Sequence, residues 1–212
     1  MRNVILFLAG TILTAAIAGA QEADTYEVTI TNVTHGQTFT PFLATTHKLR
    51  LALFQPGEPA RSELAELAES GNIDPMTTYL DSRPAVFETS STEGLLEPGQ
   101  SVTLMIQSMR PFNRLSFAAM LIPTNDTFVA LDAALLPEDT ATYTAYAWDA
   151  GSEVNDELCA NIPGPACGGE ALSAADGEGF VHVSNGIHGI ADLDPAEYDW
   201  RNPVATVSVK RL

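Results

Sequence analysis

The sequence predicts an all-β fold, an antiparallel β-sandwich of about eight strands with one short helix. Short runs of alternating apolar and polar residues recur along the chain, which is the pattern of strands buried on one face. Turn residues separate these runs, and helical periodicity is confined to one segment. Strands that follow one another without intervening helices favour antiparallel pairing over βαβ units, so we expect a sandwich.

The strand pattern is clearest in two runs, SVTLMI at residues 101–106 and VATVSV at residues 204–209. In both, β-branched and aliphatic side chains alternate with polar ones, as a half-buried strand requires. Residues 26–32, YEVTITN, show the same alternation. In chain order the expected strands are residues 26–32, 49–54, 101–108, 115–122, 128–131, 141–148, 179–183 and 204–210.

The one helical segment begins at Pro59 and ends at Ser70 and Gly71. Proline in the first turn and glycine just past the end are typical helix boundaries. The apolar side chains that share one face are Ala60, Leu64, Leu67 and Ala68. We expect this helix to cover one end or edge of the sandwich.

Residues 1–20 have the features of a secretory signal peptide: a positive residue near the start, an apolar run and small residues before Gln21. The apolar run is too short for a lasting membrane span, which disfavours an uncleaved anchor. We therefore expect cleavage between Ala20 and Gln21, a secreted or periplasmic protein without a transmembrane span, and a single domain over residues 21–212.

The chain is strongly acidic. Lys and Arg number 10 against 27 Asp and Glu, which gives a formal net charge of −17. Such a field repels a phosphate backbone, so nucleic acid is disfavoured as a partner. Divalent cations or basic partners fit the charge better, although acidity also keeps secreted proteins soluble.

The chain has two cysteines, Cys159 and Cys167, eight residues apart. In an oxidising compartment a disulfide is the simplest interpretation, because a turn through Pro163, Gly164 and Pro165 can bring the two thiols together. A redox or zinc role is the weaker alternative, since a second cysteine pair is absent from the sequence.

The same region concentrates carboxylates. Asp149 and Glu153 flank Gly151 directly after an expected strand, and hard cations such as Ca²⁺ prefer carboxylate and carbonyl oxygens on a chain that bends tightly. An EF-hand starting at Asp149 is excluded, because Val154 stands where the loop needs glycine and the last position lacks glutamate. The pattern predicts part of a calcium site.

The runs AWDAGSE at residues 147–153 and NDTFV at residues 125–129, with YEVTITN at residues 26–32 and NGIHG at residues 185–189, resemble the spondin domain family, particularly its stand-alone bacterial members. The first two runs are the most specific. The resemblance extends from about residue 26 to the end of the sequence, and its length agrees with a single domain.

This resemblance implies a β-sandwich similar to calcium-dependent lipid-binding sandwich domains, with one calcium ion at an end loop. In animal spondin domains, the ion is held by the aspartate of an SPDWFV motif and by two acidic residues of a DAGTD motif. The matching positions here are Asp126, Asp149 and Glu153. Thr127 replaces the aromatic residue after the first aspartate, and Glu153 replaces an aspartate with a longer carboxylate that can still reach Ca²⁺.

The four histidines support a second hypothesis, a transition-metal-binding protein or a metal-dependent enzyme. His182 and His188 flank a turn and could form a site together with His35 or His47. The sequence has no helical His-x-x-x-His spacing to enforce this, so polar or hydrogen-bonding roles are favoured for each histidine.

We expect no enzymatic activity, because the chain lacks the G-x-S-x-G, H-E-x-x-H and phosphate-loop patterns. The leading hypothesis is a secreted calcium-binding module for binding or adhesion to an extracellular or cell-envelope partner. The class of that partner is left open between a protein, a glycan and a lipid, as is the oligomeric state.

Overall fold

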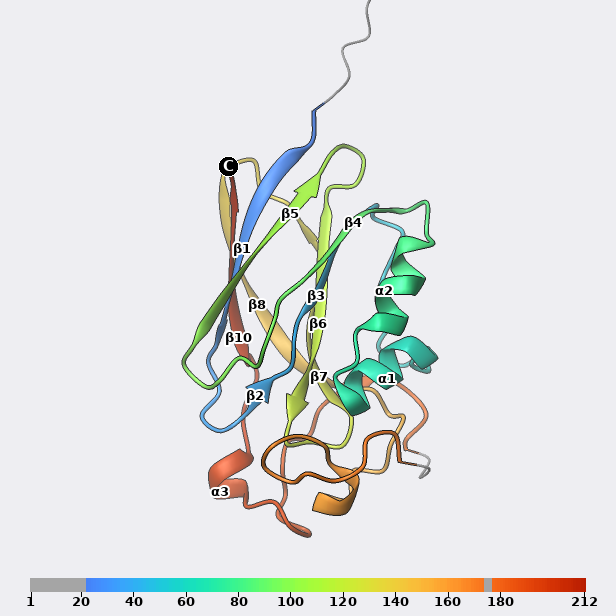
Figure 1. Ribbon diagram of the computed structural model, residues 1–212, viewed down its shortest axis with the longest axis vertical. Coiled ribbons are helices and arrows are strands. Elements are labelled where there is room, and N and C mark those ends of the chain that lie inside the picture. Colours follow the sequence, from blue (N-terminus) through green and yellow to red (C-terminus); the bar gives the residue numbers. More distant parts are fainter. Residues whose placement is uncertain (1–21, 174–176) are drawn as a thin grey trace, which may run out of the picture.

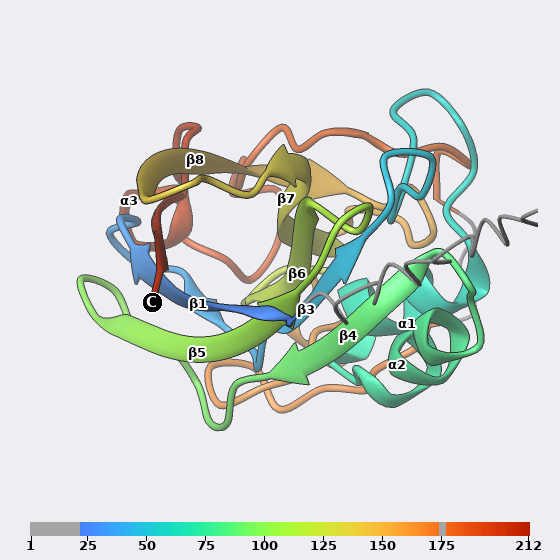
Figure 2. The same cartoon turned by 90° about the horizontal axis from the view of Figure 1, so that it is seen from above.

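The computed structural model describes residues 22–173 and 177–212; the predicted signal peptide, residues 1–20, lies outside the described residues. The strands form a mostly antiparallel sandwich that curls into a nearly closed ring (Figure 1, Figure 2). In chain order they are β1 (Asp24–Asn32), β2 (Thr38–Phe39), β3 (Leu43–His47), β4 (Val86–Ser91), β5 (Ser101–Ser108), β6 (Arg114–Ile122), β7 (Thr127–Leu135), β8 (Thr140–Asp149), β9 (His182–Val183) and β10 (Ala205–Arg211). This confirms the predicted fold class.

Spatially the main strands follow the order β4-β3-β6-β7-β8-β10-β1-β5, with β2 paired to β6 and β9 paired to β8. The two ends of this order, β4 and β5, lie side by side (Figure 2). Side chains connect them: the Ser90 hydroxyl donates to the carbonyl of Met105 at 3.1 Å, and the Glu88 carboxylate accepts from the amide of Gln107. The curled sheet therefore encloses an interior.

That interior holds the larger apolar core. Along β1 buried and half-buried residues alternate, as its sequence predicts, and Val28 and Ile30 point inward. Three buried phenylalanines pack edge to face, with ring centroids 5.8 Å apart for Phe39 and Phe42 and 5.4 Å apart for Phe42 and Phe117. Burial of these rings is the main local source of stability.

A second apolar core lies outside the ring, between the sheet and two helices, α1 (Ser62–Ser70) and α2 (Asp74–Asp81). Leu64 and Leu67 of α1 and Leu80 of α2 are fully buried there, beside Phe128 of β7. The segment of β6 that follows Arg114 is buried on both faces, which explains why its sequence is nearly continuously apolar.

The predicted helix ends at the correct residue, but its predicted first residue and its predicted position on the sandwich are wrong. Helix α1 begins at Ser62, with Arg61 as its N-cap, rather than at Pro59; it ends where predicted, with Gly71 in the left-handed conformation. It covers a face of the sheet through contacts with β6 and β7, not an end or edge. Helix α2 was not predicted, because its short sequence has only two buried apolar residues.

Most predicted strands are present with small changes of boundary, but residues 49–54 do not form a strand. The amide of Leu53 donates to the side chain of Asp132 at 3.0 Å instead of to a neighbouring strand. The actual strand, β3, is buried at all five positions, so it lacks the alternation that identifies half-buried strands. Strand β4 was missed as well, since its side chains are partly exposed without a clear period.

The loops that leave β6, β8 and β9 gather at one end of the sandwich, together with a 3₁₀ turn (Cys159–Asn161) and helix α3 (Pro195–Tyr198) (Figure 1). The predicted disulfide between Cys159 and Cys167 is confirmed and lies in this loop region. Among the described residues, no helix combines the length and the apolar character needed to cross a membrane.

Replacement of Phe117 by alanine is expected to lower the free energy of unfolding by about 3–5 kcal/mol, because it leaves a cavity among well-packed rings. Urea denaturation measures this loss. The matched control is Leu135→Ala on the neighbouring strand, where the side chain is 49% exposed and the expected change stays within about 0.5 kcal/mol. Equal losses in the two variants would contradict the assignment of the core.

Candidate metal centre

Strand pairing brings two of the predicted carboxylates to the same end of the sandwich. Thr127, the first residue of β7, lies opposite Asp149, the last residue of β8. Asp126 immediately precedes this pair, and its carbonyl accepts a hydrogen bond from the amide of Ala150 at 3.1 Å. The two aspartates are therefore held by the sheet itself rather than by flexible loops.

Asp126 is 0% exposed, and its two carboxylate oxygens have different surroundings. Oδ2 accepts hydrogen bonds from the backbone amides of Ser152 at 2.8 Å and Glu153 at 3.0 Å, so it shapes the loop after β8. Oδ1 is buried and has no hydrogen-bond partner among the described residues. A buried anionic oxygen without a donor is costly unless a proton or a cation contacts it.

Asp149 is also buried, and both of its oxygens accept hydrogen bonds: Oδ1 from the amide of Gly151 at 2.8 Å, Oδ2 from the side-chain amide of Asn155 at 2.9 Å. The turn at Gly151 has φ of +64°, and a Cβ there would lie 2.2 Å from the carbonyl oxygen of Phe180. Glycine is required at this position because the segment after residue 177 passes directly over the loop.

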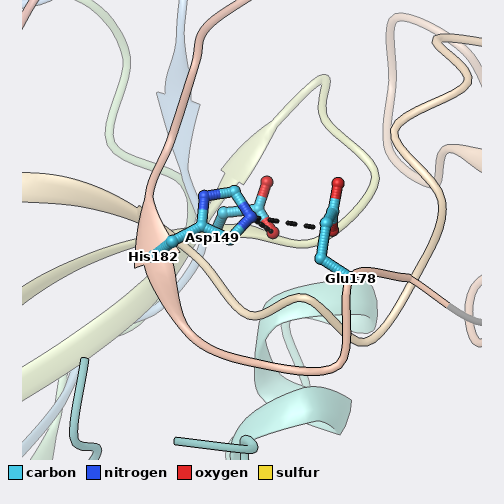
Figure 3. Close-up of side chains that lie close together, drawn as sticks. All are labelled: Asp149, Glu178 and His182. Atoms are coloured by element: carbon cyan, nitrogen blue, oxygen red, sulfur yellow. Dashed lines mark ion pairs between the residues drawn. The ribbon is translucent and has the colours of Figure 1, made fainter. Parts of the chain in front are cut away.

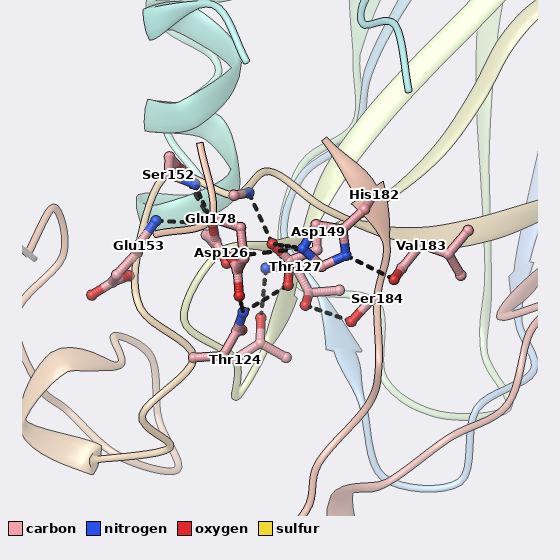
Figure 4. A network of polar contacts seen from close by, with 12 residues as sticks. Thr124, Asp126, Thr127, Asp149, Ser152, Glu153, Glu178, His182, Val183 and Ser184 are labelled. Carbon is pink, nitrogen blue, oxygen red and sulfur yellow. Dashed lines mark hydrogen bonds and ion pairs between the residues drawn. The ribbon is translucent and has the colours of Figure 1, made fainter. Parts of the chain in front are cut away.

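Glu153 contacts Asp126 through its backbone amide, not through its carboxylate. Its amide contacts Asp126, while Figure 4 shows its carboxylate pointing away from Asp126 and Asp149. Within the described residues neither carboxylate oxygen has a well-formed hydrogen bond, although the Ser173 hydroxyl and the Asn125 amide lie close enough to favour the charged form. The predicted trio is thus assembled only in part.

Burial shifts the titration of this group. It raises the pKa of Asp149 from 3.8 to about 7, and the charge of Asp126 adds to the effect. Burial also raises the pKa of Glu153 from 4.5 to about 7, with the charge of Glu69 contributing, and the pKa of Asp126 moves in the same direction for the same reason. Buried carboxylates with oxygens that lack hydrogen-bond donors are suitable ligands for a hard cation such as Ca²⁺.

Two further residues that could contact a cation are Glu178 and His182 (Figure 3). His182 lies opposite Asp149 in the β8–β9 pair, and its Nε2 is 3.4 Å from Asp149 Oδ1 and 3.6 Å from Glu178 Oε2. His182 was predicted only as part of a site with other histidines, and Glu178 was not predicted. The available signal was an acidic residue four positions before a histidine in a strand-like run.

The histidine site of the second hypothesis is not formed. In the part of the chain that the structure describes, no cluster of three metal-binding side chains contains more than one histidine. His35 and His188 contact backbone carbonyls, and His47 is buried against the hydroxyl of Ser116 at 2.8 Å. These three histidines have the hydrogen-bonding roles that the sequence favours.

Other carboxylates of the acidic loop serve its structure. The buried Glu157 accepts hydrogen bonds from the amides of His188 at 2.6 Å and Ile190 at 2.9 Å, which joins two loops distant in the sequence. Asp156 accepts from the amide of Leu158 at 2.9 Å. The concentration of acidic residues here therefore reflects loop anchoring as well as a candidate metal centre.

In the presence of a chelator, the free energy of unfolding should fall as the pH rises from about 4 to about 7 and then level off. Asp149 and Glu153 titrate at about 7 in the folded protein, against 3.8 and 4.5 ordinarily, so the folded state keeps protons that the unfolded chain has released. Urea denaturation between pH 5 and pH 8 measures the slope. It should be smaller in Asp149→Asn, and an unchanged slope would contradict the raised pKa.

Replacement of Gly151 by alanine is expected to destabilise the protein more than replacement of Gly179. Both glycines have positive φ, +64° and +82°, so alanine costs about 1–2 kcal/mol at either position. At Gly151 the added Cβ also collides with the backbone of Phe180, whereas nothing lies within 4 Å at Gly179. Chemical denaturation compares the two, and equal losses would show that the loop does not pack as described.

The Spondin_N family model matches residues 24–156. The matched residues include Asp126, Asp149 and Glu153 and end before Glu178 and His182. No curated protein matches the chain. The match covers more than half of the sequence and agrees with the antiparallel sandwich, so this chain belongs to the Spondin_N family.

Proposed function

We propose that this protein is an exported calcium-binding module, in which the ion orders the loops at one end of the sandwich and creates a surface for an extracellular or cell-envelope partner. The role is binding or adhesion rather than catalysis. Membership of the Spondin_N family supports a binding-type module, and the disulfide between Cys159 and Cys167 suits an oxidising compartment. Residues 1–20 supply the expected signal peptide.

One observation carries the proposal: Asp126 and Asp149 are neighbouring buried carboxylates, and Asp126 Oδ1 has no donor among the described residues. Burial raises the pKa of both carboxyl groups; the charge of Asp126 adds to the effect at Asp149, and the charge of Glu178 adds to it at Asp126. A divalent cation between them removes both the repulsion and the unpaired oxygen.

The proposed ligands from this chain are Asp126, Asp149 and Glu153. Both oxygens of Glu153 lack well-formed hydrogen bonds within the described residues, so a turn of this side chain towards the ion breaks none. Calcium takes six to eight oxygen ligands, and backbone carbonyls and water complete such a shell. When bound, the ion neutralises charge and holds the loop after β8 against the start of β7.

The loops around the candidate metal centre also expose apolar side chains. We expect the partner to bind at these loops. The five large ones that lie on described segments following β8 or flanking β9 are Val154, Leu158, Leu172, Phe180 and Ile190. Exposed apolar side chains at one end of a domain fit an interaction surface when they form a contiguous patch. Ordering of these loops by an ion then couples calcium to partner binding.

Calcium in hundredfold excess over its Kd should raise the melting temperature of the protein by roughly 5–10 °C, because binding to the folded state alone stabilises it by about 2.7 kcal/mol. Asp149→Asn should abolish the increase. The matched control is Asp139→Asn, which removes the same charge from an exposed position in the turn between β7 and β8. Thermal unfolding with and without chelator measures the effect.

Isothermal titration calorimetry measures the Kd for calcium directly and does not depend on the melting curve. Absence of heat and of thermal stabilisation at millimolar calcium would overturn the calcium proposal. Equal stabilisation of wild type and Asp149→Asn would overturn the assigned ligands.

A further inference from the structure

We propose that the same end of the sandwich holds a zinc-type divalent ion through a mixed nitrogen and oxygen set, His182, Asp149 and Glu178. The inference rests on the proposed metal-binding function, since Asp149 belongs to both donor sets. The inference adds a second type of metal ion to the proposed function. Two of its ligands, Glu178 and His182, lie outside the residues that the family model matches. Imidazole nitrogen suits zinc and related ions, whereas calcium prefers oxygen.

The spacing of the three donors is that of ligands around a shared ion. His182 Nε2 lies 3.4 Å from Asp149 Oδ1 and 3.6 Å from Glu178 Oε2, and all three ligand atoms lie within 4.8 Å of one another. Bonds of about 2.0–2.2 Å at tetrahedral angles place neighbouring ligands about 3.4 Å apart. A direct charge-assisted hydrogen bond brings nitrogen and oxygen to about 2.7–2.9 Å, closer than either contact here.

The imidazole of His182 is oriented as a metal ligand. Its Nδ1 lies 3.0 Å from the carbonyl oxygen of Val183, which can only accept, so in the neutral ring Nδ1 carries the proton. The lone pair of Nε2 then faces the two carboxylates, and Nε2 is buried without a hydrogen-bond partner in the described part of the chain. Histidine ligands commonly donate their second ring N–H to a backbone carbonyl in this way.

Asn155 holds the two carboxylates in position. Its side-chain amide donates to Asp149 Oδ2 at 2.9 Å and to Glu178 Oε1 at 3.3 Å. Glu178 is therefore held through one oxygen and Asp149 through both, because Asp149 Oδ1 also accepts from the amide of Gly151. The oxygens nearest His182 are Asp149 Oδ1 and Glu178 Oε2 (Figure 3). An amide that orients two ligands through their remaining oxygens is a typical outer-shell contact of a metal site.

A second, independent observation points to a cation at this place. Asp126, which is 0% exposed and has the unpartnered oxygen Oδ1, lies beside Asp149 and Glu178 (Figure 4). A hollow of about 210 Å³, lined in part by Asp149, Asn155 and Glu178, gives an ion access from solvent. The Glu178 side chain is 41% exposed and can adjust to the ion at little cost.

Titration of the purified protein with Zn²⁺ by calorimetry, after treatment with chelator, tests the proposal against Ca²⁺ titration of the same sample. Wild type should bind Zn²⁺, and His182→Gln should bind it at least about 100-fold more weakly, since loss of an outer-shell partner alone costs about 10–100-fold. The Ca²⁺ affinity of the variant should change less than about threefold, because calcium prefers oxygen ligands. Glu178→Gln should weaken Zn²⁺ binding in the same direction. The matched control is His188→Gln, an exposed histidine that lines the same hollow and should leave both affinities unchanged.

Absorption of Co²⁺-loaded wild type provides a readout that does not depend on a variant folding: the visible bands of a four-coordinate ion should appear and should be lost on adding Zn²⁺. Equal Zn²⁺ affinity in wild type and His182→Gln, or Ca²⁺ binding without any Zn²⁺ binding, overturns this inference and leaves the calcium proposal standing. If the protein binds Zn²⁺ through His182 but does not bind Ca²⁺, the zinc inference is supported and the calcium proposal is overturned. Failure to bind either ion overturns both.

Discussion

The antiparallel register of β7, β8 and β9 is the constraint on which the candidate metal centre depends. Thr127 and His182 are both paired with Asp149, so three segments distant in the sequence contribute side chains to one place. A slip of one residue in either pairing would turn these side chains to the opposite face of the sheet. The apolar cores on both sides of β6 and β7 prevent such a slip, because it would also expose buried side chains.

Buried negative charge gives this end of the sandwich its chemical character. Some carboxylate oxygens are satisfied by backbone amides, as in Glu157 and Asp126 Oδ2, and these shape the loops. Others, such as Asp126 Oδ1, have no donor among the described residues and require a proton or a cation. Under the proposed function, the burial that raises the pKa of Asp149 would link loop order to a bound cation.

Local patterns were sufficient for elements with one buried face. Strands such as β1 and β5 alternate in burial as they do in sequence, and Gly71 marks the end of α1. The prediction was wrong where both faces are covered: β3 is buried at every position, so its sequence carries no period, and residues 49–54 resembled a strand only because they are apolar.

The sequence by itself determined the fold class, the disulfide pair and the segments that carry the acidic motifs, because these follow from local periodicity, cysteine spacing and residue type. Only the tertiary structure decided which donors meet. It placed Glu178 and His182 beside Asp149 and turned the Glu153 carboxylate away, since strand pairing and loop packing act between residues far apart in the chain. Spacing along a sequence does not encode such distances.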